Sequence, residues 1–214
     1  LDEQEGNWES RAERGWTNQR RETLRAICDR ILNRLEWADL ARSGLSSDDE
    51  MEFHRANQVA ETLGIETWEW HWHRLQQKPD ESGRWYHVMA RCIEDRIGDM
   101  VALAERNIAL AQIATGAGKE LGLGPGFEPH QCLDFVLQEL RKFPGQGEKL
   151  IEAGLQSPVV RNRNMAVSVL AAWGQENCSE PVRQALTAAL KSEPADDVRE
   201  RMQKALKGEP TESE

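Results

Sequence analysis

Two similar phrases near the end of the chain constrain its fold more than any other feature. Ser-Pro-Val-Val-Arg at 157–161 precedes a helical pattern that runs to Gly174, and Ala-Asp-Asp-Val-Arg at 195–199 precedes one that runs to Gly208. The two Val-Arg pairs are 38 residues apart. Such a period is typical of stacked helical hairpins, each of which buries its apolar face against its neighbours. The sequence therefore predicts an all-α protein built of antiparallel helical hairpins.

Apolar residues also recur at helical spacing before these phrases. We expect an N-terminal helical segment at 20–115, a Gly-rich connection at 116–128 and helical repeats at 129–208. The helices of the N-terminal segment are predicted at 23–40, 48–63, 65–77 and 84–115. Gly44 should break the first of these and Gly64 should end the second, because glycine is common after a helix. A kink is expected near Gly98 in the long fourth helix.

The two ends of the chain are strongly polar. We expect the charged lead, 1–19, and the acidic tail, 209–214, to be disordered. The lead starts at Leu1 and carries no apolar signal-peptide core, which indicates an internal fragment or a processed product.

The repeat region has two recognisable hairpins, with turns at Ser157-Pro158 and at 194–197. Between Gly147 and Gly208 they resemble the HEAT-type family of α-solenoids. The resemblance implies a HEAT/armadillo-like superhelix whose second helices line a concave binding face. It would place Arg161, Asn164 and Ser168 on one binding stripe. An alternative is that Arg161 and Arg199 only bridge neighbouring hairpins.

The segment Trp-Glu-Trp-His-Trp-His at 68–73 has the most unusual local composition. His71 and His73 point about 160° apart on a helix, because they are two residues apart, so we predict no metal site here. Trp68 and Trp72 are expected in the core. Trp70, His71 and His73 would form an amphipathic rim that binds a protein partner, since tryptophan is enriched at interaction hot spots.

The chain carries a formal net charge of -10, which disfavours a nucleic acid partner. The first forty residues are an exception, because they are rich in arginine. Their arginines could contact nucleic acid or an acidic lipid surface, or could form a solvated face with internal ion pairs. The apolar runs are too short for a membrane span of about 20 residues.

Other sequence features exclude common kinds of chemistry. Gly-Ala-Gly-Lys at 116–119 lacks the spacing of a phosphate-binding loop, and we interpret it as a flexible connection. Glu94, Asp95 and Asp99 have arginine neighbours that favour solvated ion pairs over acid-base catalysis. No Gly-x-Ser-x-Gly motif occurs and no cofactor is indicated. Four cysteines without a Cys-x-x-Cys pair are typical of buried, reduced thiols in a cytoplasmic protein.

These observations predict a non-enzymatic helical-repeat module that acts as a scaffold and binds a protein partner. The alternative is an enzyme or small-molecule binder, with an aromatic and histidine-lined pocket between the helices at 65–77 and 84–115. The sequence gives no basis for an oligomeric state.

Overall fold

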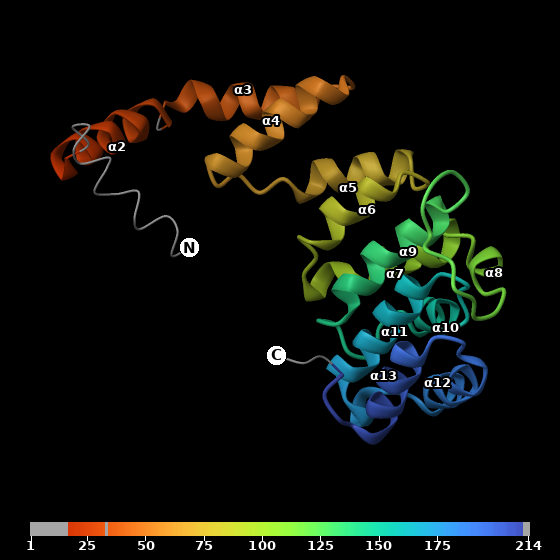
Figure 1. The fold of residues 1–214 in the computed structure, drawn as a ribbon. Coiled ribbons are helices and arrows are strands. Elements are labelled where there is room, and N and C mark those ends of the chain that lie inside the picture. Colours follow the sequence, from red (N-terminus) through yellow and green to blue (C-terminus); the bar gives the residue numbers. More distant parts are fainter. Residues whose placement is uncertain (1–16, 33, 212–214) are drawn as a thin grey trace. The chain divides into compact units, whose positions relative to one another are not determined.

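The computed structural model of the protein describes residues 17–32 and 34–211. These residues form helices and one isolated backbone bridge, and they contain no strand (Figure 1). The predicted all-α class is therefore confirmed. The chain divides into two compact units, Leu1–Trp70 and His71–Glu214, and each is described by itself. Most of the predicted lead and half of the predicted tail lie outside the described residues.

The first unit is organised around a helical hairpin of α3 (Leu35–Leu45) and α4 (Glu50–Thr62). Asp49 caps α4 by accepting a hydrogen bond from the backbone N–H of Glu52 at 2.7 Å. The core of the hairpin contains Ala41, Leu45, Phe53, Ala56 and Ala60. Gly64 follows α4 with a φ of +69°, as predicted for a residue that ends a helix.

The helix predicted at 23–40 is two helices. α2 (Asn18–Leu32) ends before Arg34, which is extended, and α3 then continues to Leu45. The predicted break at Gly44 is wrong, because Gly44 lies inside α3. A Cβ atom at Gly44 would lie 2.7 Å from the Cβ of Ala56, so glycine here allows the close approach of α3 and α4.

The second unit is built from short helices that form two layers in its C-terminal part (Figure 1). One layer contains α9 (Glu128–Leu140), α11 (Val160–Trp173) and α13 (Asp196–Lys207) side by side. The other contains α8 (Leu110–Ile113), α10 (Glu148–Leu155) and α12 (Glu180–Ser192), and the short helix η1 (Gln175–Asn177) precedes α12. The predicted turn at Ser157-Pro158 lies between α10 and α11, and the one predicted at 194–197 begins between α12 and α13.

The long helix predicted at 84–115 is wrong. It is replaced by α6 (Ser82–Met89), α7 (Glu94–Asn107) and α8. Ile93 and Ile108 have extended backbones and separate the three helices. Buried residues of α6 and α7 keep the spacing of a single helix across the break at Ile93, and the buried Ile108 follows Ala104 at the same spacing. Periodicity alone therefore did not reveal the breaks. α7 continues through Gly98, where a kink was expected.

The boundary between the units also differs from the sequence prediction. It falls within α5 (Trp68–Gln77), so the Gly-rich connection at 116–128 lies inside the second unit. The prediction of buried thiols holds for Cys132 and Cys178, whereas Cys28 is exposed and Cys92 is half-buried. Among the described helices, none is both long enough and apolar enough to cross a bilayer.

Candidate functional site

The loop between α8 and α9, residues 114–127, presents two large apolar side chains to solvent. Leu121 and Leu123 are each 74% exposed, more than any other large hydrophobic residue of the described chain. Contiguous exposed apolar groups on a soluble protein often mark a binding surface. We therefore take this segment, the α8–α9 loop, as the candidate site.

Backbone hydrogen bonds hold the loop against the turn between α10 and α11. The N–H of Gly116 donates to the carbonyl of Gln156 at 2.8 Å, and the N–H of Glu120 donates to that of Pro158 at 3.2 Å. In return, the N–H of Val160 donates to the carbonyl of Glu120 at 3.0 Å. The flexible connection predicted from its glycine content is thus anchored at both ends of residues 116–120.

Gly122 lets the loop turn away while it stays close to α11. Its φ is +72°, a region that side chains of L-residues rarely adopt. A Cβ atom there would lie 2.7 Å from a methyl carbon of Val159. Both constraints require glycine between the two exposed leucines, so the glycine fixes where Leu121 and Leu123 are presented.

A fully buried arginine, Arg163 of α11, ties the loop to two further turns. Its guanidinium donates to the carbonyls of Gly118 at 2.7 Å and Ser157 at 2.7 Å. It also makes two hydrogen bonds to the carboxylate of Glu193, at 2.6 and 2.9 Å. Both side chains of this ion pair are 0% exposed. One residue therefore connects the α8–α9 loop, the α10–α11 turn and the α12–α13 turn.

A second buried polar network fixes the α10–α11 turn onto α9. The side-chain amide of Asn162 donates to the carbonyl of His130 at 2.9 Å and to Asp134 at 2.6 Å. Ser157 Oγ donates to Asn162 Oδ1 at 2.8 Å and accepts from the N–H of Val159 at 3.1 Å. Burial raises the pKa of Asp134 to about 6, although the hydrogen bond from Asn162 and the charge of Arg161 oppose the rise.

Ser157, His130 and Asp134 have the residue types of a hydrolase triad but not its geometry. His130 Nδ1 lies 2.7 Å from the side-chain amide oxygen Oδ1 of Asn162, which can only accept, so Nδ1 donates to it and cannot take a proton from Ser157. Ser157 is 0% exposed. Asp134 contacts Asn162 and Arg161. The arrangement is suited to packing rather than to acyl transfer.

The predicted stripe on α11 faces its neighbours. Asn164 and Ser168 accept hydrogen bonds from the guanidinium of Arg201 on α13, at 3.1 and 2.8 Å. Arg161 pairs with Asp134 of α9 at 3.1 Å, and its side chain is 56% exposed. Arg161 therefore bridges two neighbouring hairpins, as the alternative predicted, whereas Arg199 contacts Asp196 and the carbonyl of Glu193 within its own hairpin. A partner-binding role for Arg161, Asn164 and Ser168 stays a prediction.

The three residues of the predicted Trp/His rim have different surroundings. Trp70 packs against the α3–α4 core, and its ring N–H donates to Ser46 at 3.3 Å. His73 is exposed, as expected for a rim. His71 is only 5% exposed, so the predicted rim position is wrong for this residue. Its ring stacks on that of His87, with the ring centroids 5.0 Å apart. Burial, with the nearby His87, lowers the pKa of His71 to about 3.

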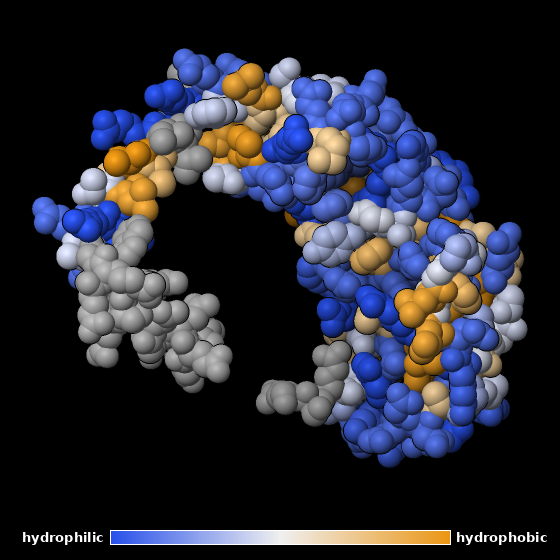
Figure 2. Space-filling model, turned by 45° about the horizontal axis from the view of Figure 1, so that its top comes forward, coloured by the Kyte–Doolittle hydropathy of each residue, from blue (hydrophilic) through white to orange (hydrophobic). Residues whose placement is uncertain are grey.

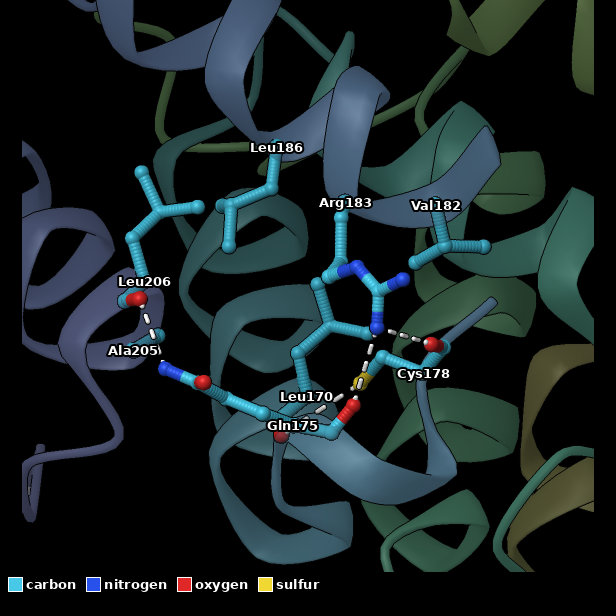
Figure 3. Close-up of a pocket in the computed structure, with 8 residues that line it drawn as sticks. All are labelled: Leu170, Gln175, Cys178, Val182, Arg183, Leu186, Ala205 and Leu206. Atoms are coloured by element: carbon cyan, nitrogen blue, oxygen red, sulfur yellow. Dashed lines mark hydrogen bonds between the residues drawn. The ribbon is translucent and has the colours of Figure 1, made fainter. Parts of the chain in front are cut away.

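A small cavity lies between η1 and helices α11, α12 and α13 (Figure 3). Its volume is about 30 Å³, enough for about two water molecules. Arg183 on its wall donates to the carbonyls of Gln175 and Cys178, and Gln175 donates to that of Leu206 (Figure 3). These bonds join the last helices, and the space is too small for an organic substrate.

The His, Cys, Asp and Glu side chains of the described residues were also compared with the requirements of a metal site. Within residues 17–32 and 34–211, no group of three or more His, Cys, Asp or Glu side chains is placed to hold a metal ion.

Sequence reasoning missed the residues that build the α8–α9 loop. A signal for Arg163 was present, because it lies on the stripe of α11 that includes Ala166, Val167 and Leu170, all buried. A charged residue on an apolar stripe indicates a buried ion pair or hydrogen-bond network. The exposure of Leu121 and Leu123 had no such signal, because it depends on which side of the loop packs against α11.

Comparisons with known proteins gave no relative: no family model, no curated protein and no solved structure matches the chain.

Proposed function

We propose that the protein is a non-enzymatic helical-repeat module that binds a protein partner through the α8–α9 loop. The observation that carries this proposal is the anchored pair Leu121 and Leu123, each 74% exposed. The HEAT-type resemblance of residues 147–208 supports the same class of function, because repeat stacks commonly serve as binding scaffolds. The partner would offer an apolar recess that accepts two leucine side chains.

Anchoring matters for affinity. A mobile apolar loop loses conformational entropy on binding, whereas a loop already held by backbone bonds and by Arg163 loses less. The two leucines are thus apolar side chains that are already held in position before a partner binds. The alternative function, a small-molecule site beside the Trp/His helix, is less favoured because His71 and His87 are packed against each other.

The test is a binding measurement with the full chain. A captured protein would be purified, and its affinity would be measured for the parent and for Leu121→Glu/Leu123→Glu. We expect the dissociation constant to rise at least about tenfold, since burying a leucine side chain is worth about 1.5–3 kcal/mol and about 1.4 kcal/mol is a factor of ten.

The matched control is Met51→Glu/Ile93→Glu, which changes two other exposed apolar residues. It should leave the affinity unchanged, and both variants should keep the circular dichroism of the parent. Equal loss of binding in both variants, or no loss in the loop variant, would overturn the proposal.

A further inference from the structure

Helix α2 has an apolar stripe that no described helix covers extensively. Leu24 is 47% exposed, Ile27 is 43% exposed and Cys28 is exposed, and the three lie on one side of the helix. A 15-residue helix is marginally stable in water unless its apolar face is packed. Figure 2 shows hydrophobic residues along α2 and α3 (orange).

Arg20 continues the line of this stripe toward the start of α2, and the other charges of the helix lie beside or behind the stripe. With 3.6 residues per turn, Arg25 and Arg30 lie about 110° to either side of its centre, and Glu22 and Asp29 lie about 150–170° away. The long arginine side chains can reach forward to the edges of the stripe. α2 contains four arginines and two acidic residues, a net charge of +2, so it fits an apolar surface with an acidic edge.

Such a surface lies on α3 of the same chain. Trp37 is 37% exposed and Leu40 is 61% exposed, one helical turn apart. Glu36 lies about 70° and Asp39 about 130° from the centre of this second stripe on its open side, and Asp39 also pairs with Arg42 at 3.4 Å. On the other side of the stripe, Ala41 is buried in the α3–α4 core. Residues 35–62 contain seven acidic and two basic residues, a net charge of -5.

We propose that α2 of one copy docks on α3 of a second copy, and that the second copy returns the same contact. Within one chain the two stripes do not cover each other, because both remain exposed. Pairing of α2 with a second α2 would bring two positive helices together. The reciprocal contact instead matches opposite charges twice, as a two-fold symmetric dimer requires.

The area is sufficient for a stable dimer. A helix of this length is about 22 Å long and 11 Å wide, so half of its lateral surface is about 400 Å². The shorter α3, with 11 residues, has a corresponding half-surface of about 290 Å². Two α2 faces and two α3 faces together present at most about 1,400 Å², within the roughly 1,200–2,000 Å² of standard interfaces. An anionic membrane would also attract α2, but it would repel the acidic edge of α3, so a second copy accounts for both stripes.

Charge reversal in a mixing experiment tests the dimer. Sedimentation of the full chain should show a mass that rises toward twice that of one chain as concentration increases. We expect Arg25→Glu/Arg30→Glu alone, and Glu36→Arg/Asp39→Arg alone, to weaken association at least about tenfold, because each places like charges in both contacts. An equal mixture of the two should recover the parent's dimer, because both contacts are then attractive.

The control Lys191→Glu/Lys207→Glu reverses two exposed charges of the second unit and should leave the dimer unchanged. A parent that stays monomeric at about 100 μM, well above the micromolar range of modest complexes, would overturn the proposal. So would a mixture that stays as weak as its components. Flotation with phosphatidylserine vesicles provides the other outcome: a monomeric parent whose vesicle binding requires Arg25 and Arg30 would assign the stripe to lipid.

Discussion

Two buried titratable residues of the second unit act in opposite directions as the pH falls. The pKa of His71 is lowered from 6.5 to about 3, so between these values the unfolded chain binds a proton that the folded chain excludes. Its contribution to stability therefore falls as pH falls. The pKa of Asp134 is raised from 3.8 to about 6, so the folded chain binds the extra proton and its contribution grows. Each slope is at most about 1.4 kcal/mol per pH unit.

Single substitutions should separate these two effects. His71→Phe keeps a ring against His87 but removes the imidazole that takes up a proton only in the unfolded chain. We therefore expect this variant to lose less stability than the parent between about pH 7 and pH 4.5. Asp134→Asn keeps an acceptor for Asn162 but removes the carboxyl group that takes up a proton in the folded chain. This variant should therefore lose more stability than the parent over the same pH range. Urea unfolding at both pH values measures the difference. A pH dependence equal to that of the parent in both variants would contradict the assignment.

At the scale of elements, buried and exposed arginines on the same helix should differ in their effect on stability. Arg163→Met leaves Glu193 charged, buried and without its ion pair, which costs about 3–5 kcal/mol in comparable buried pairs. Arg161→Met removes a largely exposed partner of Asp134, which typically costs about 0–1 kcal/mol. Denaturant unfolding of the two variants measures both costs.

The Arg163 variant should also release the α8–α9 loop. Its guanidinium holds the carbonyl of Gly118, so amide hydrogen exchange in residues 116–122 should become faster, while Arg161→Met leaves it unchanged. Equal destabilisation by both substitutions, with no change in loop exchange, would show that Arg163 does not anchor the loop.

The accuracy of the sequence predictions followed the local signals of each element. α11 was predicted at its observed bounds because Pro158 and Gly174 mark its two ends. The segment from Ser82 to Ile113 carries no proline between its helices, so its breaks at Ile93 and Ile108 depend on tertiary packing. The prediction for Gly44 failed because this glycine is set by tertiary packing too: it allows α3 to approach Ala56 of α4 closely and does not end the helix.

The candidate site was harder to predict than the fold. The glycine content of residues 116–126 indicated a connection, but glycine permits both a mobile loop and one that packs closely. The bonds to Gln156, Pro158 and Arg163 join residues far apart in sequence, and nothing in the local pattern shows them. Leucine is most often a core residue, so the sequence contained no sign that Leu121 and Leu123 are exposed; the folded loop shows it.

At the scale of the whole molecule, packing is uneven along the chain. In α9, α10 and α11 many side chains are completely buried, among them Leu133, Val136, Leu150, Ile151 and Ala166. The α3–α4 hairpin has a smaller core of five buried residues. α2 has exposed apolar residues, so its helical hydrogen bonds gain little protection from packing in a single copy. Local stability should therefore rise from α2 to α11.

Hydrogen exchange followed by mass spectrometry at a concentration that keeps the chain monomeric should show this order. We expect the amides of α10 and α11 to exchange slowest and those of α2 fastest, with α3 and α4 between them, because exchange from a helix requires local opening against its packing. Raising the concentration should slow exchange in α2 and α3 alone if these helices meet in a second copy, because the dimer covers no part of α10 or α11. Uniform exchange along the chain would contradict the unequal packing of the two units.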